Sequence, residues 1–381
     1  MFDFCIVGGG MIGAATALGL AKKGFSIALI ETHMPKAFEP SDEPDIRVSA
    51  ISVTSQALLD SLGAWQYIEQ MRTCSYARLS VWERPDCRTD FVSDDINTPR
   101  LGYIIENRVL QLGLHQALAD FPNVTWFCDS PVKEIVPGDK PLVHLTDKRV
   151  LSCRWLIGAD GLRSQVREAA CIGTQGWQYS QQAFAIQIIT HAPQQDITWQ
   201  QFIPTGPVAF LPMYAQFASL VWYNTSDNIK RLKTLSPVAL KQEIIKAFPQ
   251  ELVDFDVLKT AHFPLMRMHA NQYVKEHVVL IGDAAHAINP LAGQGVNLGF
   301  KDVAVLLECI GDEQPQDKDL LRYESLRRKD NLLMMSAMDA IYGTFKQRNP
   351  LFKVMRNLGF KLANHGGVIK HQVMKYAMGL N

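Results

Sequence analysis

The chain has 381 residues with 38 basic and 38 acidic side chains, and 47% of its residues are hydrophobic. This composition argues against an intrinsically disordered chain, and the balanced charge offers no argument for nucleic-acid binding. Seven scattered cysteines without a C-x-x-C pair argue against a disulfide framework or a metal site, which favours a protein of the reducing cytoplasm.

The N-terminal segment has the pattern of a β-α-β unit. Residues 2–7 and 25–30 are short apolar runs typical of buried parallel strands, and 11–23 predicts a helix that ends at Gly24. The uncharged stretch 4–21 is interpreted as part of this unit and not as a membrane span or a signal peptide. No basic region precedes the stretch, and consecutive glycines interrupt it early.

The remaining chain is predicted to alternate helices and strands after an irregular, proline-rich loop over residues 33–46. Further helices are predicted over 49–72, 102–121, 236–249 and most of the chain after 296. Further strands are predicted over 76–92, 124–128, 155–158, 277–282 and within the aromatic, alternating segment 177–223. The part from 199 to 223 is expected to roof a substrate pocket, with most of its aromatic side chains in the core.

The first predicted strand runs into a glycine fingerprint. Gly8, Gly10 and Gly13 have the spacing G-x-G-x-x-G, and Glu31 ends the next strand 18 residues after the last glycine. In such a unit the glycines allow a tight turn and close approach of a pyrophosphate to the helix start, and the carboxylate accepts from a ribose hydroxyl. The fingerprint predicts a dinucleotide site without distinguishing NAD from FAD. The alternative is a glycine turn that binds no ligand.

Two further motifs each join a strand end to a glycine-bearing turn. The first contains Asp160 and Gly161, and the second begins with Gly282 and Asp283. The second motif continues with Pro290, Gly293, Gln294, Gly295 and Asn297. An Asp at a strand end can accept from sugar-like hydroxyls, and a glycine-rich helix start directs N–H groups at an acceptor that becomes anionic. Each motif by itself could also be an Asp-Gly turn or a helix cap.

The order and spacing of the three motifs resemble those of the class A flavoprotein monooxygenases, the family of para-hydroxybenzoate hydroxylase. The resemblance implies FAD as cofactor and NADPH or NADH as co-substrate. It assigns the N-terminal glycines to the ADP moiety, the middle motif to FAD and the passage of NAD(P)H, and the third to the ribityl chain and isoalloxazine. A single β-α-β fingerprint agrees with the absence of a separate nicotinamide domain.

The same resemblance implies an α/β fold, in which a Rossmann-like FAD-binding domain is interleaved with an α+β substrate domain built on a sheet and is followed by C-terminal helices. The expected boundaries are 1–75, 100–175 and 265–335 for the FAD-binding domain, 76–99 and 176–264 for the substrate domain, and 336–381 for the C-terminal helical region.

Further residues of the site follow from the resemblance. Arg47 matches the arginine on the mobile loop beside the flavin, and Asn107 matches a position, often Arg or Gln, that contacts FAD. Whether the neighbouring Arg108 takes that contact stays open. Arg47 is expected to act in catalysis with Pro290, Gly293 and Gly295, which would position the flavin. His286 is expected to be a structural hydrogen-bonding group more often than a base.

Six segments resemble the ubiquinone-biosynthesis hydroxylases within this family: 44–52, 198–212, 218–223, 263–274, 289–299 and 355–360. This resemblance implies hydroxylation of a polyprenyl benzoquinol ring with O₂, and membership of a multi-enzyme ubiquinone-synthesis complex. A sister enzyme that hydroxylates another ring position is an alternative, as is a non-catalytic flavoprotein of that complex. An NAD-dependent dehydrogenase would leave two motifs unexplained, and the W-x-W-x-I-P motif of flavin-dependent halogenases is absent.

The C-terminal residues 340–381 carry seven basic side chains and no acidic one. The basic residues are Lys346, Arg348, Lys353, Arg356, Lys361, Lys370 and Lys375. Apolar residues recur between them at helical spacing, a pattern that predicts peripheral contact with an anionic membrane, such as the inner membrane surface, or docking to a partner. The alternative is a helix that packs on the domain with a solvated basic face.

Overall fold

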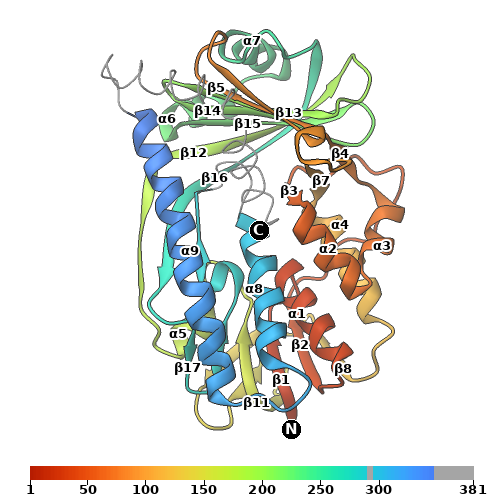
Figure 1. Cartoon of the computed structure of the whole chain (residues 1–381), viewed down its shortest axis with the longest axis vertical. Coiled ribbons are helices and arrows are strands. Elements are labelled where there is room, and N and C mark those ends of the chain that lie inside the picture. The colour runs from red at the N-terminus through yellow and green to blue at the C-terminus, as the bar shows by residue number, and fades with distance from the viewer. Residues whose placement is uncertain (290–294, 347–381) are drawn as a thin grey trace.

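The first sheet of the molecule is mostly parallel and lies in the lower half of Figure 1. The computed structural model describes residues 1–289 and 295–346. The strand order of this sheet is β17-β18-β11-β1-β2-β8, and β9 and β10 form an antiparallel extension of β11. Its strands are β1 (Phe2–Val7), β2 (Ile27–Glu31), β8 (Val124–Cys128), β9 (Val132–Val136), β10 (Leu142–Leu145), β11 (Val150–Gly158), β17 (Val274–Lys275) and β18 (Val278–Leu280).

Three parallel strands of this sheet end in register. Val7 of β1 pairs with Gly158 of β11, and Gly158 pairs with Leu280 of β18. Each of the three sequence motifs lies at the end of one of these strands. Strands of an open α/β sheet present ligand sites at their carboxyl ends. The sheet therefore brings together three segments that lie far apart in the sequence.

Helices cover the parallel sheet closely. They are α1 (Met11–Lys22), α4 (Asn107–Leu118) and α8 (Gly295–Ile310), and the short α5 (Gln165–Ala169) follows β11. Helix α1 ends as predicted, because Gly24 adopts a left-handed φ of +87°. A Cβ atom on Gly19 would lie 2.2 Å from Cδ1 of Leu307, so glycine at this position lets α1 and α8 pack closely.

A small sheet corrects two predictions from the sequence. Strand β7 (Gly102–Glu106) pairs with β3 (Val48–Ser52) and with β4 (Cys74–Tyr76). The helices α2 (Val53–Leu62) and α3 (Trp65–Met71) lie between β3 and β4 in the chain. The helices predicted over 49–72 and 102–121 therefore begin as strands. Periodicity does not separate a short apolar run such as 102–106 from a buried helical turn, and here strand pairing decides.

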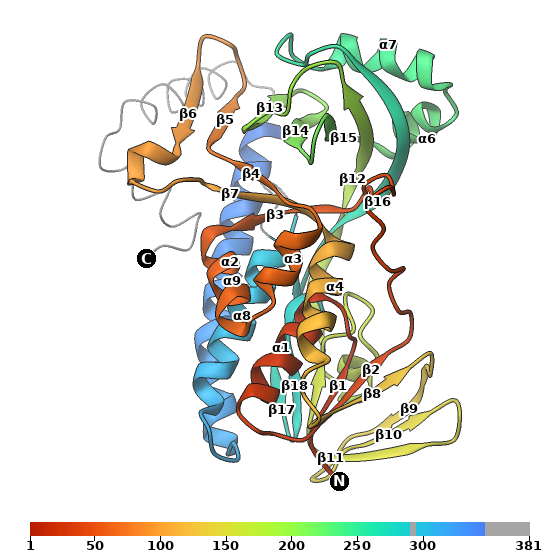
Figure 2. The same ribbon diagram turned by 90° about the vertical axis from the view of Figure 1, so that its right-hand side faces the viewer.

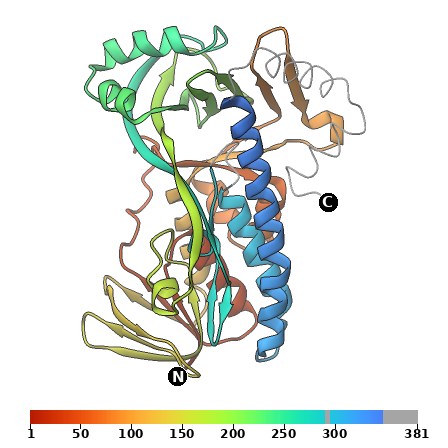
Figure 3. The same cartoon turned by 90° about the vertical axis from the view of Figure 1, so that its left-hand side faces the viewer.

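The second sheet has eight strands in the order β19-β16-β12-β15-β14-β13-β5-β6. Their bounds are β5 (Arg78–Trp82), β6 (Arg88–Val92), β12 (Thr174–Thr190), β13 (Ile197–Ile203), β14 (Gly206–Pro212), β15 (Phe217–Thr225), β16 (Phe255–Ala270) and β19 (His286–Ala287). The short 3-10 helix η1 (Ser93–Ile96) follows β6 in the chain, and η2 (Gly282–Ala284) precedes β19. Figure 3 shows the long strands β12 and β16 of this sheet extending down beside the first sheet.

Side chains alternate between the two faces of this second sheet. Ala218, Leu220 and Trp222 of β15 pack in a core with α6 (Ser226–Lys233) and α7 (Pro237–Ala247). The residues between them face the first sheet. The aromatic residues Trp199, Phe210 and Trp222 belong to the core under the helices, as expected from the sequence.

Two features of the chain lie along the side of the molecule. The connection from β2 to β3 runs up to the second sheet, as Figure 2 shows, and both Gln187 Nε2 and Lys259 Nζ donate to the carbonyl oxygen of Pro44 there. Helix α9 (Asp317–Lys346) passes without a break through the boundary expected at residue 335, and the division into domains stays a prediction.

Within residues 1–289 and 295–346, no helix is long and apolar enough to cross a membrane.

Candidate functional site

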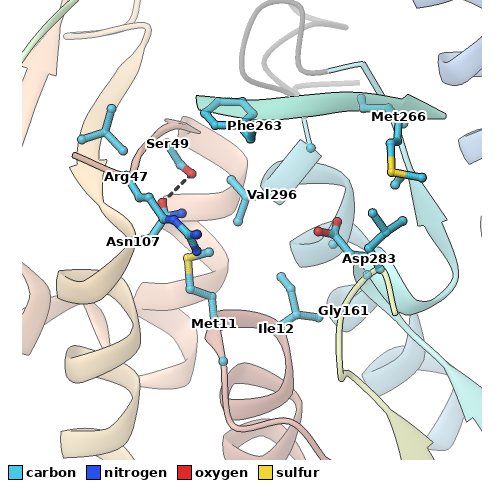
Figure 4. Close-up of a pocket in the computed structure, with 18 of the residues that line it drawn as sticks. Met11, Ile12, Arg47, Ser49, Asn107, Gly161, Phe263, Met266, Asp283 and Val296 are labelled. Atoms are coloured by element: carbon cyan, nitrogen blue, oxygen red, sulfur yellow. Dashed lines mark hydrogen bonds between the residues drawn. The ribbon is translucent and has the colours of Figure 1, made fainter. Parts of the chain in front are cut away.

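A cavity of about 480 Å³ lies between the carboxyl edge of the first sheet and the inner face of the second. Its floor is formed by the turns after β1, β11 and β18 and by the start of α8. Its roof is formed by β12, β14, β15 and β16. The wall between them includes Arg47, Ser49 and Asn107, and Figure 4 shows Arg47 and Asp283 on opposite sides of the space. The segment from 199 to 223 contributes Leu211, Ser219 and Val221 to the roof, which confirms its expected position.

The glycine fingerprint forms the turn between β1 and α1. Gly8 has a φ of +102°, and a Cβ atom there would lie 2.4 Å from the carbonyl oxygen of Ala159. A Cβ atom on Gly13 would lie 1.8 Å from the carbonyl oxygen of Gly8, so the helix approaches the turn as closely as the fingerprint predicts. Gly10 differs, because its Cβ position has no atom within 4 Å and faces the cavity. No side chain caps α1, which leaves its first N–H groups for a ligand.

Glu31 stands at the end of β2 beside this turn. Its Cβ would be 2.9 Å from a Cβ atom on Gly9, and its Oε1 accepts from the backbone N–H of His33 at 2.9 Å. The carboxylate is therefore placed next to the helix start, at the position expected for a ribose contact.

Arg47 and Asn107 meet at the side of the cavity. The backbone N–H of Asn107 donates to the carbonyl of Arg47 at 2.9 Å, and Ser49 Oγ donates to Asn107 Oδ1 at 2.7 Å. Arg47 is exposed, and no described residue pairs with its guanidinium. Arg108 points elsewhere, since its guanidinium pairs with Asp42 at 3.4 Å and does not line the cavity. Of the two neighbours left open by the sequence, the structure thus places Asn107 at the cavity.

The middle motif places Gly161 and Asp160 differently. Gly161 lines the cavity and has a φ of +78°, which favours glycine. Asp160 does not line it; its Oδ2 accepts from the N–H of Val166 at 3.2 Å, at the start of α5. Its Oδ1 is buried without a partner among the described residues. One half of this carboxylate therefore has a structural partner, and the other half is free to accept from a ligand.

The third motif presents Asp283 to the cavity. Gly282, with a φ of +60°, turns the chain, and the side chain of Asp283 accepts no hydrogen bond from the described residues. The open cavity leaves this side chain accessible, although protein surrounds it on its other sides. Because the surrounding residues exclude water, the pKa of the Asp283 carboxyl is raised. The charge of Asp302 raises this pKa further, whereas His286 lowers it.

A buried polar network that the sequence did not predict supports this motif. Asp302 Oδ2 accepts from the N–H of Gly282 at 3.1 Å and contacts His286 Nε2 at 2.5 Å, and Asp302 Oδ1 accepts from Arg327 Nε at 2.7 Å. Asn331 Nδ2 donates to the same carboxylate at 3.1 Å. These partners lie on η2, β19, α8 and α9, and no local pattern connects them. His286 is enclosed in this network and does not line the cavity, as its expected structural role requires.

The start of α8 completes the floor. Gly295 lines the cavity, and its Cβ position has no atom within 4 Å. The side chain of Asn297 is turned away: it accepts from the N–H of Ser52 at 2.9 Å and from Ser55 Oγ at 2.8 Å, and donates to Ala50. Asn297 therefore ties α8 to the start of α2 and does not line the cavity. Pro290, Gly293 and Gln294 lie outside the described residues.

These features fit a dinucleotide with a long sugar-like chain. Open space at Gly10 allows a pyrophosphate to approach the uncapped start of α1, and Glu31 stands beside that turn. The acceptors Asp283 and Asp160 Oδ1 have no partner among the described residues and can accept from hydroxyl groups. The second sheet closes the far end with apolar side chains, which suits an aromatic molecule beside the cofactor.

The fold and this cavity are those of a flavin-dependent oxidoreductase. The family model described as "FAD binding domain" matches residues 1–332, and the chain belongs to this family of FAD-dependent monooxygenases.

Known relatives span the full chain. The chain is 42% identical to 3-demethoxyubiquinol 3-hydroxylase of Escherichia coli (strain K12), over 99% of this chain and 98% of the relative. It is 32% identical to the mitochondrial ubiquinone biosynthesis monooxygenase COQ6 of Danio rerio, over 99% of this chain and 90% of the relative. Among solved structures, p-nitrophenol 4-monooxygenase PnpA from Pseudomonas putida DLL-E4 superposes with a TM-score of 0.82 at 21% identity, covering 99% of this chain and 96% of that one. At this identity the last likeness concerns the fold alone.

Proposed function

We propose that this chain hydroxylates the aromatic ring of a polyprenyl benzoquinol, in the manner of a 3-demethoxyubiquinol 3-hydroxylase, with NADPH or NADH as reductant and O₂ as oxidant. The observation that carries the proposal is a single cavity that joins the three-motif cradle to an apolar sheet face, in a chain 42% identical over its full length to the E. coli hydroxylase. Bound FAD would accept a hydride from the nicotinamide and activate O₂ for insertion of one oxygen atom into the ring.

The residues on the floor of the cavity would hold the cofactor. We assign the uncapped start of α1 with Gly10 to the pyrophosphate and Glu31 to the ribose hydroxyls. Asp283 would accept from the ribityl chain, and Asp160 and Gly161 would contact the cofactor from the middle motif. The N–H groups at the start of α8, near Gly295, would stabilise negative charge on the reduced ring.

The roof of the cavity would hold the substrate. Six apolar residues of the second sheet line it: Ala185, Leu211, Val221, Phe263, Pro264 and Met266. An apolar wall excludes water from the reacting centre and holds a flat ring by contact area. Arg47 would stand at the entrance, where its unpaired cation can attract the phosphates of the nicotinamide co-substrate.

A reconstitution experiment tests this function. The purified protein should release FAD on denaturation and oxidise NADH or NADPH faster when a short-chain demethoxyubiquinol is added, with one hydroxylated product per reductant consumed. In cells that lack the protein, one demethoxy intermediate should accumulate. Accumulation of an intermediate that lacks a different ring hydroxyl would assign the chain to a sister hydroxylase. Normal quinone content together with no turnover would leave only a non-catalytic role.

A long prenyl tail requires access to a membrane, and the basic C-terminal segment supports peripheral contact with one. This segment, from Lys346 onward, lies outside the residues whose side chains the structure describes. We propose that it binds anionic lipid at the inner membrane surface and that the enzyme acts within a ubiquinone-synthesis complex. Each basic group near such a surface contributes about 1 kcal/mol. Replacement of Lys353, Arg356 and Lys361 by Glu should therefore abolish flotation with anionic vesicles at low salt while FAD content stays normal.

A further inference from the structure

Two buried polar atoms of the second sheet have no partner among the described residues, and one of them belongs to a residue that lines the cavity. One is Oγ of Ser219, whose residue is 2% exposed, and the other is Oε1 of Gln187, whose residue is fully buried. Leaving a buried polar group without a hydrogen bond carries a penalty that native proteins rarely accept. Two such atoms at one place indicate that something else binds there.

The two residues are neighbours on the sheet. Ser219 of β15 pairs directly with Gln187 of β12, so both side chains emerge on the same face. Directly opposed residues of an antiparallel pair have Cβ atoms about 5 Å apart. On the same strand Val221 lines the cavity, while Leu220 and Ala218 turn to the core below α6 and α7. Ser219 therefore faces the cavity, and Gln187 lies beside it without lining the cavity itself.

The surrounding wall makes this polar pair distinctive. Among the described residues that the second sheet contributes to the cavity lining, Ser219 is the one with a polar side chain. The orientation of the neighbouring amide is set, because Gln187 Nε2 donates to the carbonyl oxygen of Pro44 at 2.9 Å. Its Oε1 is consequently left as an acceptor. The Ser219 hydroxyl is thus a single donor in an otherwise apolar wall, which matches a ligand oxygen that can accept a hydrogen bond.

We propose that the Ser219 hydroxyl pairs with one phenolic oxygen of the substrate ring. The hydroxyl donates a hydrogen bond to that oxygen. The apolar neighbours hold the ring face, so this single oxygen decides how the ring is rotated in the cavity and which carbon faces the cofactor. This hydrogen bond thus determines regiochemistry as well as affinity. This inference rests on the proposed function, since it requires a ring that carries hydroxyl groups.

A titration with matched ligands tests this hydrogen bond. Oxidised, FAD-loaded protein is titrated without oxygen with a short-chain benzoquinol and with analogues that each lack one ring oxygen, and binding is followed by the flavin absorbance. Loss of one neutral hydrogen bond is expected to raise the Kd of Ser219→Ala for the full quinol about tenfold. Wild type and Ser219→Ala should have the same Kd for the analogue that lacks the ring oxygen recognised by Ser219. Product analysis should show a loss of positional selectivity in the same variant.

Two further variants make the result decisive. Thr198→Val removes another buried hydroxyl of the same sheet, one that already donates to the carbonyl of Phe210 at 2.8 Å, and should leave quinol affinity unchanged. Ser219→Cys replaces Ser219→Ala if the latter does not retain FAD, and should weaken binding in the same way. Equal Kd values for wild type and the Ser219 variants with every quinol would overturn the inference. Failure of wild type to bind any quinol would overturn the proposed function and this inference with it.

Discussion

His286 Nε2 and Asp302 Oδ2 lie 2.5 Å apart, and both side chains are almost completely enclosed by protein. The same carboxylate accepts from the backbone of Gly282 and from Arg327, so one buried group joins the turn before the cavity to α8 and α9. Although burial by itself raises the pKa of Asp302, the ion pairs and hydrogen bonds from His286 and Arg327 prevail and lower it to about 2. The position of Asp283 in the cavity thus depends on a residue that does not touch the cavity.

Asp302→Ala should lower the free energy of unfolding by about 3 kcal/mol, because it removes one of the two carboxylates that pair with the buried Arg327 and leaves Asp330 as the other. Urea unfolding measures the change. Asp227→Ala is the matched control, since it removes the partner of an exposed ion pair with Lys230 and should change stability by less than about 1 kcal/mol. Equal losses in the two variants would contradict the structural role of Asp302.

His269 should make the stability of the protein sensitive to mild acid. Burial, followed by the charges of Arg328, His286 and Arg267, lowers the pKa of His269 from 6.5 to about 4. Between these two values the unfolded chain binds a proton at this imidazole and the folded chain does not. The free energy of unfolding therefore falls as the pH drops from 6.5 to about 4, by roughly 1–3 kcal/mol.

Unfolding of His269→Gln across the same pH range measures this effect. The variant lacks the titrating group, so the difference in stability between wild type and variant should change with pH. A difference that is constant from pH 7 to pH 4 would exclude His269 as the cause.

Gly10→Ala and Gly13→Ala should fail in different ways. A Cβ atom on Gly10 meets no protein atom within 4 Å, so this variant should fold normally and bind FAD more weakly, because the methyl group enters the cofactor space. A Cβ atom on Gly13 would be 1.8 Å from a backbone oxygen, and relief of that overlap should cost about 1–3 kcal/mol of stability. Thermal unfolding of the apoproteins and FAD titration separate the two effects. Normal FAD affinity in Gly10→Ala would argue against a pyrophosphate at this turn.

Asp283→Ala should weaken FAD binding much more than Asp160→Ala. Asp283 has no partner among residues 1–289 and 295–346, so its loss should remove only its bonds to the cofactor, worth about 1.5–3 kcal/mol for an ionised acceptor, or roughly ten- to a hundredfold in Kd. Asp160 also accepts from Val166, so its loss should lower stability by about 1 kcal/mol as well. FAD titration of each apoprotein tests this order. An unchanged Kd in Asp283→Ala would remove that residue from the site.

Arg47→Ala should slow reduction of the flavin by NAD(P)H more than it lowers the FAD content. The guanidinium lines the cavity and has no described partner, so its removal should not disturb the fold. Loss of one charge-assisted contact corresponds to about a tenfold or greater decrease in rate. Stopped-flow reduction gives the rate, with Arg47→Lys as the control that keeps the charge. A rate equal to wild type in Arg47→Ala would place the co-substrate elsewhere.

The sequence by itself determined the parts of the site that are encoded locally. The β1-α1 turn could be predicted because Gly8 and Gly13 meet steric limits within a few residues of each other, and Glu31 follows at the spacing of one helix and one strand. The alternation within residues 177–223 similarly predicted a sheet, and most of the aromatic side chains of residues 199–223 were expected in the core. The steric limits of the turn and the alternation of side chains along a strand both act over a few neighbouring residues. The spacing of residues in the sequence therefore shows them directly.

Tertiary structure decided everything that depends on a partner distant in the chain. Residues 102–106 became a strand because β3 and β4 were available to pair with them. Arg108, the open alternative to Asn107 for a cofactor contact, pairs with Asp42. Asn297, which was expected at the cofactor, instead connects α8 to the start of α2. The contacts of Asp302 with Arg327, and of Ser219 with its neighbour Gln187, join segments 25 and 32 residues apart. A buried charge or hydroxyl takes whichever partner the packed elements bring within 3 Å, and no periodicity in the sequence records that choice.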